Sequence, residues 1–211
     1  VSDHPYEQGF DLRLWPQRLL QPLRWKKPRM IFVNSMSDLF HKKIPRQFID
    51  SVFDTMEIAD WHVYQILTKR SSLMRNYVRK RYSGGQTPKN IWLGVSVENQ
   101  AYVGRVKHLK EINCLGRFVS FEPLLGDVQE IDLQGIAWAI VGGESGPRAR
   151  SMNPDWAISI KEKCARDGVE FFFKQWGGPR PKSGGRLLEG AEWNGFPWQI
   201  VPRSIVDRLR S

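Results

Sequence analysis

Six short apolar runs, each closed by polar residues on its C-terminal side, recur along the chain. The runs are MIFVNSMSD (30–38), HVYQILTKR (62–70), NIWLGVSVEN (90–99), RFVSFEP (117–123), WAIVGGESG (138–146) and VEFFFKQWG (169–177). They are rich in β-branched and aromatic residues, which favour strands. Most segments between the runs place apolar residues at helical spacing, so the pattern predicts parallel strands joined by helical crossovers.

The segments between the runs predict helices at 44–59, 71–82, 98–112 and 153–168. Pro45 stands at the start of the first of these, where a helix tolerates proline. Asn153 and Gly168 mark the two ends of the last. By contrast, residues 124–136 are too short and too interrupted by glycine for a full crossover helix. One connection between strands is therefore expected to lack a helix.

An α/β fold follows from this order of elements. The strands can form an open barrel-like sheet or a doubly wound sheet, and we favour the first: a partial (β/α) barrel of about six mostly parallel strands. A chain of 211 residues is long enough for one large core. We expect residues 1–178 to form this core with an N-terminal lead-in. Residues 179–211, rich in glycine and proline, are expected to form an extension packed on it.

The bulk composition predicts a globular protein without a membrane partner. The hydrophobic fraction is 41% and the mean hydropathy is −0.45. No stretch approaches the roughly 18 apolar residues of a membrane span. The two cysteines, Cys114 and Cys164, have no Cys or His neighbour at metal-ligand spacing, so we expect no metal site and a reducing, cytoplasmic location. Because the first residue is Val1, the true start is expected upstream.

Positive charge is concentrated in the segment 69–110. Ten basic residues stand there against one acid, Glu98, although the whole chain carries a net charge of +10. Tyrosines interleave with the cations, a pattern that suits phosphate contacts and base stacking on a nucleic acid. The same charges can equally belong to two solvated helix faces, and the sequence leaves both interpretations open.

Polar residues follow each of the six predicted strands. Since ligands of α/β proteins bind outside the carboxyl ends of the strands, we expect these residues to converge on one site. They are Asn34, Asp38, Thr68, Lys69, Ser96, Glu98, Glu122, Glu144 and Lys174.

The glycine pair Gly142 and Gly143 precedes Glu144 at the end of the fifth run. Glycines allow backbone N–H groups to approach a ligand, and Glu144 can accept hydrogen bonds from an amine or a ribose hydroxyl. The pattern is neither a Walker loop nor the dinucleotide fingerprint. A tight turn at the end of the strand is the alternative explanation.

Two lysines and two glutamates are the strongest candidates for contacts with substrate. Lys69 can bind a phosphate or a carboxylate. Glu98 and Glu122 can each act as a base, orient a ligand, or pair with Lys69 and Lys174. For Lys174 we rank pairing with a carboxylate first. Because the four histidines are scattered, no hydrolytic triad is expected, and catalytic roles stay unassigned.

The chain resembles a phage-associated family of unknown function over most of residues 20–178. The segments that carry the resemblance are IFVNSMSDLFH (31–41), QILTKR (65–70), IWLGVSVENQ (91–100), FVSFEPLLG (118–126), VGGESGPRARSMNPDW (141–156) and FFFKQWG (171–177). Full-length members look like radical S-adenosylmethionine proteins, which are partial α/β barrels with a preceding cysteine cluster of the form Gly-Cys-x-x-Cys-Tyr-Ala. This sequence has no such cluster.

The resemblance implies S-adenosylmethionine and an iron–sulfur cluster for full-length relatives. Three thiolates are needed to hold the cluster, so we expect no cofactor in this chain, which would lack the first cysteine-bearing β-α unit of the barrel. Loss of that unit and a natural cluster-free relative both stay open. By resemblance, the cofactor-facing residues would be Asn34, Asp38, Ser96, Glu98, Gly142, Gly143 and Glu144. Lys69, Glu122 and Lys174 stay the expected substrate-binding residues on their own chemistry.

Two functions from different classes follow from the sequence. The first is the cluster-less core of a radical S-adenosylmethionine-like phage or prophage protein, inactive alone in that chemistry, whose complete form acts on nucleic acid or another macromolecule. The alternative is a cofactor-free nucleic-acid-binding module that uses residues 69–110. A third possibility, a metal-independent hydrolase, would need a perturbed Glu98 or Glu122 near Lys174. The sequence does not fix the oligomeric state.

Overall fold

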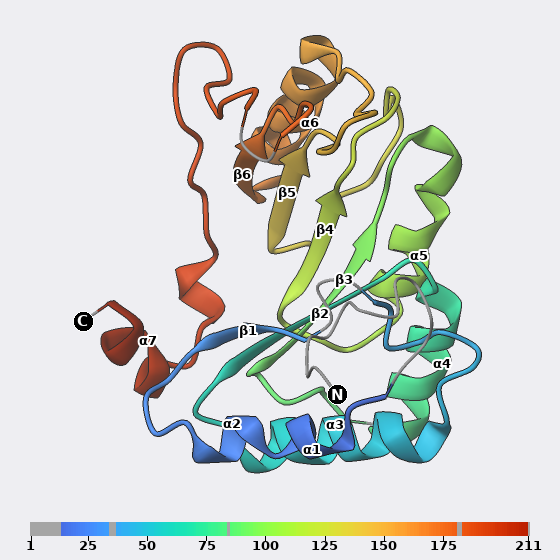
Figure 1. Ribbon diagram of the computed structural model, residues 1–211, viewed down its shortest axis with the longest axis vertical. Coiled ribbons are helices and arrows are strands. Elements are labelled where there is room, and N and C mark those ends of the chain that lie inside the picture. The colour runs from blue at the N-terminus through green and yellow to red at the C-terminus, as the bar shows by residue number, and fades with distance from the viewer. Residues whose placement is uncertain (1–13, 34–36, 84, 181–182, 211) are drawn as a thin grey trace.

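One curved, all-parallel sheet forms the centre of the protein (Figure 1). The computed structural model describes residues 14–33, 37–83, 85–180 and 183–210. Its six strands lie side by side in the order in which they occur in the sequence. They are β1 (Met30–Phe32), β2 (Val63–Thr68), β3 (Ile91–Ser96), β4 (Arg117–Phe121), β5 (Trp138–Gly142) and β6 (Glu170–Gln175). The sheet curls without closing, which confirms the predicted α/β half-barrel.

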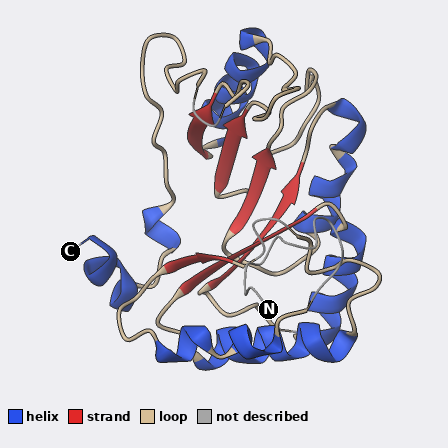
Figure 2. Cartoon of the chain, in the orientation of Figure 1, coloured by secondary structure: helices blue, strands red, loops and turns tan. Residues whose placement is uncertain are grey.

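Helices connect most of the strands and cover the outer face of the sheet (Figure 2). As expected, no helix connects β4 to β5. The crossover helices are α3 (Arg46–Ile58), α4 (Ser71–Arg81), the short 3-10 helix η1 (Gln100–Tyr102) with α5 (Gly104–Lys110), and α6 (Pro154–Asp167). The lead-in forms α1 (Pro16–Leu19) and α2 (Gln21–Arg24), and the C-terminal segment forms η2 (Trp198–Ile200) and α7 (Arg203–Arg210).

The prediction of a single helix at 98–112 is wrong, because two shorter helices occupy this segment. The Asn99 side chain accepts a hydrogen bond from the backbone N–H of Ala101 at 3.0 Å and so caps η1. A new helix begins only at Gly104. Capping by Asn99 therefore replaces the regular helical start that the apolar spacing predicted.

The outer core lies between the sheet and the helices. Alternate residues of each central strand point to this side, and Ile91, Leu93 and Val95 of β3 are fully buried there. The two cysteines, Cys114 and Cys164, are buried in the same core. This core is continuous from the N-terminal helices to α6.

The concave face of the sheet carries a second, aromatic core near the N-terminal ends of the strands. Trp92 and Trp138 pack there against Phe196 of the C-terminal segment, with ring centroids 5.5 and 5.2 Å apart. Ile205 of α7 is buried in the same cluster. Trp92 on β3 is followed on the same face by a glycine and then by Ser96. The concave face thus changes from aromatic to small and polar toward the carboxyl ends of the strands.

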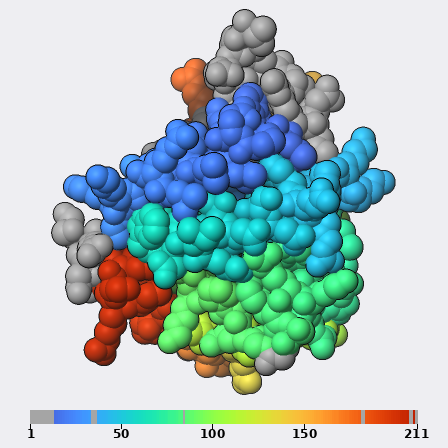
Figure 3. Space-filling view, turned by 90° about the horizontal axis from the view of Figure 1, so that it is seen from below, coloured from blue at the N-terminus to red at the C-terminus, as the bar shows by residue number. Residues whose placement is uncertain are grey.

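His62, just before β2, connects the lead-in to the sheet through its two ring nitrogens. The backbone N–H of Arg29 donates to Nδ1 of His62 at 3.0 Å, and Nε2 of His62 lies 3.0 Å from the carbonyl oxygen of Pro22. These two contacts fit the neutral ring with its proton on Nε2. Figure 3 shows this side of the molecule, where the lead-in lies beside α3. Among the described helices, none is long and apolar enough to cross a bilayer.

The buried His62 is expected to make stability depend on pH. Burial lowers the pKa of His62 in the folded protein, and the charge of Arg29 adds to this effect, whereas the hydrogen bond to Pro22 opposes it. Above about pH 6.5 the ring is neutral in both folded and unfolded chains, so its contribution is complete. Below that value the unfolded chain binds a proton that the folded chain binds less readily. The free energy of unfolding should therefore fall, by at most about 1.4 kcal/mol per pH unit.

Urea denaturation of the protein and of His62→Gln between pH 8 and pH 5 measures this effect. The variant is less stable at pH 8, but the part of the pH dependence that arises below pH 6.5 from His62 should be absent. Equal slopes for both proteins in this window would contradict the assignment.

Candidate functional site

A cavity of about 940 Å³ lies on the concave face at the carboxyl ends of the strands. We call it the concave cavity. Its floor is apolar, with Phe118 and Trp138 among the lining residues, and its upper part is polar. The predicted residues that line it are Asp38, Thr68, Lys69, Ser96, Glu122, Gly143, Glu144 and Lys174. Parallel strands thus bring together side chains that are far apart in the sequence.

Glu98 is buried beside the concave cavity, at 5% exposure. One carboxylate oxygen pairs with Lys69 and the other accepts a hydrogen bond from Arg105 at 2.8 Å. Arg105 also donates to the backbone carbonyl of Ser96 at 2.7 Å. Burial raises the pKa of Glu98, but the hydrogen bond from Lys69 and the charge of Arg105 outweigh it, so the pKa lies below its usual value. Glu98 is therefore held as a carboxylate that joins β2, β3 and α5.

Glu122 and Lys174 form a second ion pair, 3.0 Å apart, between the ends of β4 and β6. The hydroxyl of Ser120 donates to the other carboxylate oxygen at 3.2 Å. A Cβ at Gly142 would lie 2.6 Å from Oε1 of Glu122, so a larger residue there would force the Glu122 side chain to shift. The pairing expected for Lys174 is present, although its side chain is half exposed rather than buried.

Asp38 organises the segment that follows β1. Its carboxylate accepts hydrogen bonds from the Thr68 hydroxyl at 2.7 Å, from the Phe40 backbone at 2.9 Å and from Arg70 at 2.7 Å. Asp38 therefore holds the end of β2 against the loop after β1. Asn34, also expected at this site, lies outside the described residues.

Gly143 and Glu144 are engaged within the protein itself. A Cβ on Gly143 would lie 1.8 Å from the carbonyl oxygen of Trp176, so only glycine fits this close approach of two backbones. Glu144 accepts three hydrogen bonds from Arg150, at 2.8 to 2.9 Å. These bonds lower the pKa of Glu144 to about 2. The structure thus favours the tight-turn explanation of the glycine pair.

Three ion pairs at the carboxyl ends of the strands share one asymmetry: the carboxylate is less exposed than the cation. The pairs are Lys69 with Glu98 (54% and 6% exposed), Arg70 with Asp38 (37% and 15%) and Lys174 with Glu122 (54% and 20%). The cations thus offer a ligand in the concave cavity more exposed side-chain surface than their acid partners do, and each of these acids is already paired with a cation.

An iron–sulfur cluster does not fit the residues of this chain. Cys114 and Cys164, the two cysteines of the sequence, are both buried in the outer core, away from the concave face. The described residues hold no group of three His, Cys, Asp or Glu side chains that could bind a metal ion. The thiolates that such a cluster requires are therefore not supplied here.

Three parts of this site are not predicted by the sequence pattern. Arg105 was assigned only to a basic segment, and its pairing with Glu98 depends on the break between η1 and α5. Gln65 and the aromatic floor of the cavity, with Phe172, also line it. Side chains along a strand alternate between the two faces of the sheet. Gln65 therefore shares a face with Leu67 on β2, and Phe172 shares a face with Lys174 on β6, so the sequence pattern could have indicated both residues.

The fold is an α/β half-barrel with a cavity at the carboxyl ends of its strands. The chain belongs to the family described as protein of unknown function (DUF5131), whose model matches residues 2–197. Comparisons with curated proteins and with solved structures gave no match.

Replacing Glu98 should destabilise the fold much more than replacing Glu144. In Glu98→Gln the largely buried Arg105 loses its carboxylate partner, so the free energy of unfolding should fall by about 3 kcal/mol. Glu144→Gln removes a pair at the surface and should leave the midpoint of urea unfolding nearly unchanged. Urea unfolding at pH 7 measures both, and equal losses in the two variants would contradict the structural role assigned to Glu98.

Proposed function

We propose that this chain is the substrate-binding core of a radical S-adenosylmethionine-like phage or prophage protein, and that its concave cavity binds a phosphate-bearing ligand such as a nucleotide or a nucleic-acid strand. The resemblance of the six strand segments supports the class of protein. The observation that carries the ligand assignment is that Lys69, Arg70 and Lys174 are more exposed than their acid partners. Phosphate oxygens are well matched to such ammonium and guanidinium donors.

The floor of the concave cavity supports the same ligand class. Phe32 is 38% exposed, and Phe172 is partly exposed; both line the cavity. Aromatic faces of this kind stack on nucleobases whatever their sequence. A volume of about 940 Å³ is in the range of sites for nucleotide-sized ligands. A base on the floor and a phosphate at the cationic edge would use both parts of the cavity.

The proposal places substrate rather than cofactor in the concave cavity. S-adenosylmethionine has a net positive charge, because its sulfonium and ammonium outweigh its one carboxylate, and the two positive groups favour free carboxylates. Both oxygens of Glu98 and both oxygens of Glu144 are engaged by cations of the protein. Their pairing therefore supports an anionic ligand over a cationic one.

The alternative, a nucleic-acid platform along residues 69–110, has weaker support. Seven of its ten cations form ion pairs: Lys69, Arg70, Arg75, Arg79, Arg81, Arg105 and Lys110. Tyr77 is buried, and Tyr82 donates a hydrogen bond to Glu57. What favours the platform is Tyr102, which is 41% exposed and whose ring centre lies 4.2 Å from the guanidinium carbon of Arg105. Lys80, Lys89 and Lys107 are exposed, and no ion pair involves them in the described part of the chain.

AMP and adenosine differ only by the phosphate, so their affinities isolate the anion-binding part of the site. We expect the protein to bind AMP at least about tenfold more tightly than adenosine, because hydrogen bonds to charged groups contribute about 1.5–3 kcal/mol. In Lys69→Gln/Lys174→Gln this preference should disappear. Isothermal titration calorimetry at low salt measures it, with circular dichroism to verify folding.

A matched control removes two charges from the rival platform instead. Lys80→Gln/Lys107→Gln should keep the preference for AMP. If a single-stranded oligonucleotide loses affinity in this control variant but not in Lys69→Gln/Lys174→Gln, the platform at 69–110 is the binding site and the proposal is wrong. Tight binding of S-adenosylmethionine that neither lysine affects would overturn the substrate assignment in favour of a cofactor site.

A further inference from the structure

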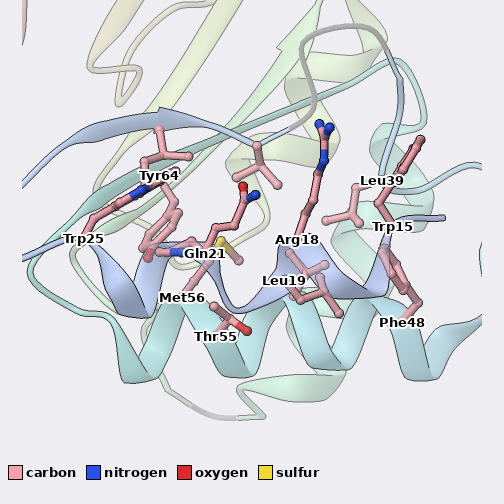
Figure 4. A pocket seen from close by; sticks show the side chains of 14 residues that line it. Trp15, Arg18, Leu19, Gln21, Trp25, Leu39, Phe48, Thr55, Met56 and Tyr64 are labelled. Carbon is pink, nitrogen blue, oxygen red and sulfur yellow. The ribbon is translucent and has the colours of Figure 1, made fainter. Parts of the chain in front are cut away.

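A second cavity lies on the opposite side of β1 from the concave cavity, under α1 and α2 (Figure 4). We call it the outer cavity. Its volume is about 260 Å³. Ile31 of β1 lines the outer cavity, whereas the next residue, Phe32, lines the concave cavity. The two cavities share no lining residue, so the outer cavity is a separate site.

The outer cavity exists because the helical layer is thin at this point. Elsewhere, residues on the outer face of the sheet are fully covered, as Ile66 and Val95 are at 0% exposure. The corresponding residues beside β1, Ile31 and Val33, are only partly buried. The helices above them contain four residues each and cannot cover the strand. A pocket therefore remains between these helices and α3.

The interior of the outer cavity is apolar. Its base includes Val52 and Met56 of α3, and Trp15 and Trp25 contribute aromatic side chains. The hydroxyl of Tyr64, which also lines it, donates to the carbonyl of Ala59 at 3.2 Å and is already satisfied. An occupant therefore needs an apolar body rather than a polar one.

One formal charge lines the outer cavity, that of Arg18. Figure 4 shows the side chains of Arg18 and Gln21 extending from the helices along the cavity. The Arg18 guanidinium lies 4.9 Å from the centre of the Trp15 ring, and no ion pair to a described carboxylate involves it. The described lining residues include no Asp or Glu. An anionic head group thus complements the outer cavity, and Gln21 can donate a further hydrogen bond to it.

We propose that the outer cavity binds a small carboxylate with an apolar body, of the size of a medium-chain fatty acid. The carboxylate pairs with Arg18, and the hydrocarbon chain occupies the space above Val52 and Met56. A free phosphate would leave the apolar interior empty, and a larger acyl chain would exceed about 260 Å³. This site is independent of the ligand proposed for the concave cavity.

Calorimetric titration of the full chain with hexanoate, heptanoate and octanoate tests the apolar part. We expect the dissociation constant to fall about fourfold per methylene, which corresponds to about 0.8 kcal/mol for each buried CH₂ group. Val52→Phe, which fills the base, should remove this dependence on chain length. Binding that is independent of chain length in the unaltered protein would overturn the proposal.

Comparison of octanoate with the neutral 1-octanol tests the role of Arg18. We expect octanoate to bind about tenfold more tightly, and Arg18→Met to abolish the difference. Arg24→Met is the matched control, since Arg24 is an exposed arginine of the same lead-in that does not line the cavity. Both arginines are exposed, so neither variant should impair folding. Equal affinity for acid and alcohol, or equal loss in both variants, would show non-specific association only.

Discussion

The arrangement of side chains at the carboxyl ends of the strands depends on the ion pairs that the buried carboxylate of Glu98 forms. It receives Lys69 from the end of β2 and Arg105 from α5, while Arg105 also binds the backbone of Ser96. A carboxylate at 5% exposure is costly to bury alone, so both cations are needed to keep it charged. One consequence is geometric: the amine of Lys69, a residue that lines the concave cavity, is fixed by its contact with Glu98. The same principle acts at Glu122, where Ser120 and Lys174 share the carboxylate.

Much of the fold could be predicted from sequence because each local signal agreed with the architecture. All six strands, the missing helix between β4 and β5, and the end of α6 at Gly168 followed from periodicity and turn chemistry. The pairs of Lys69 with Glu98 and of Lys174 with Glu122 were among the alternatives, since parallel strands bring their ends together. Arg105 and Arg150 could not be assigned, because their positions depend on loop and helix geometry that periodicity does not encode. The placement of Phe196 on the concave face likewise rests on a long-range contact.

The concave face of the sheet is apolar near the N-terminal ends of the strands and becomes polar toward their carboxyl ends. Near their N-terminal ends, Trp92, Phe118 and Trp138 are covered by the C-terminal segment, which supplies Phe196 and Ile205. Toward the carboxyl ends, small side chains leave space. A Cβ on Gly94 would lie 2.4 Å from the Phe118 ring, so the glycine is needed for that ring to lie across the sheet. The C-terminal segment therefore fills the part of the half-barrel where a ligand is not expected, and leaves the cationic edge accessible.

The net charge of the segment 69–110 and the acids that surround its individual cations lead to different conclusions about phosphate binding by this segment. By sequence it carries ten cations against one acid, but carboxylates from outside the segment pair with five of the ten: Arg70, Arg75, Arg79, Arg81 and Lys110. Arg81, for example, contacts Asp50, Asp54 and Glu57 of α3. Such pairing restricts how far these side chains can reorganise around a phosphate. At the carboxyl edge the acids lie underneath instead, so that Lys69 and Lys174 keep about half of their surface exposed. Lys69 and Lys174 also line one cavity together with aromatic side chains, so the number of cations alone does not identify the binding surface.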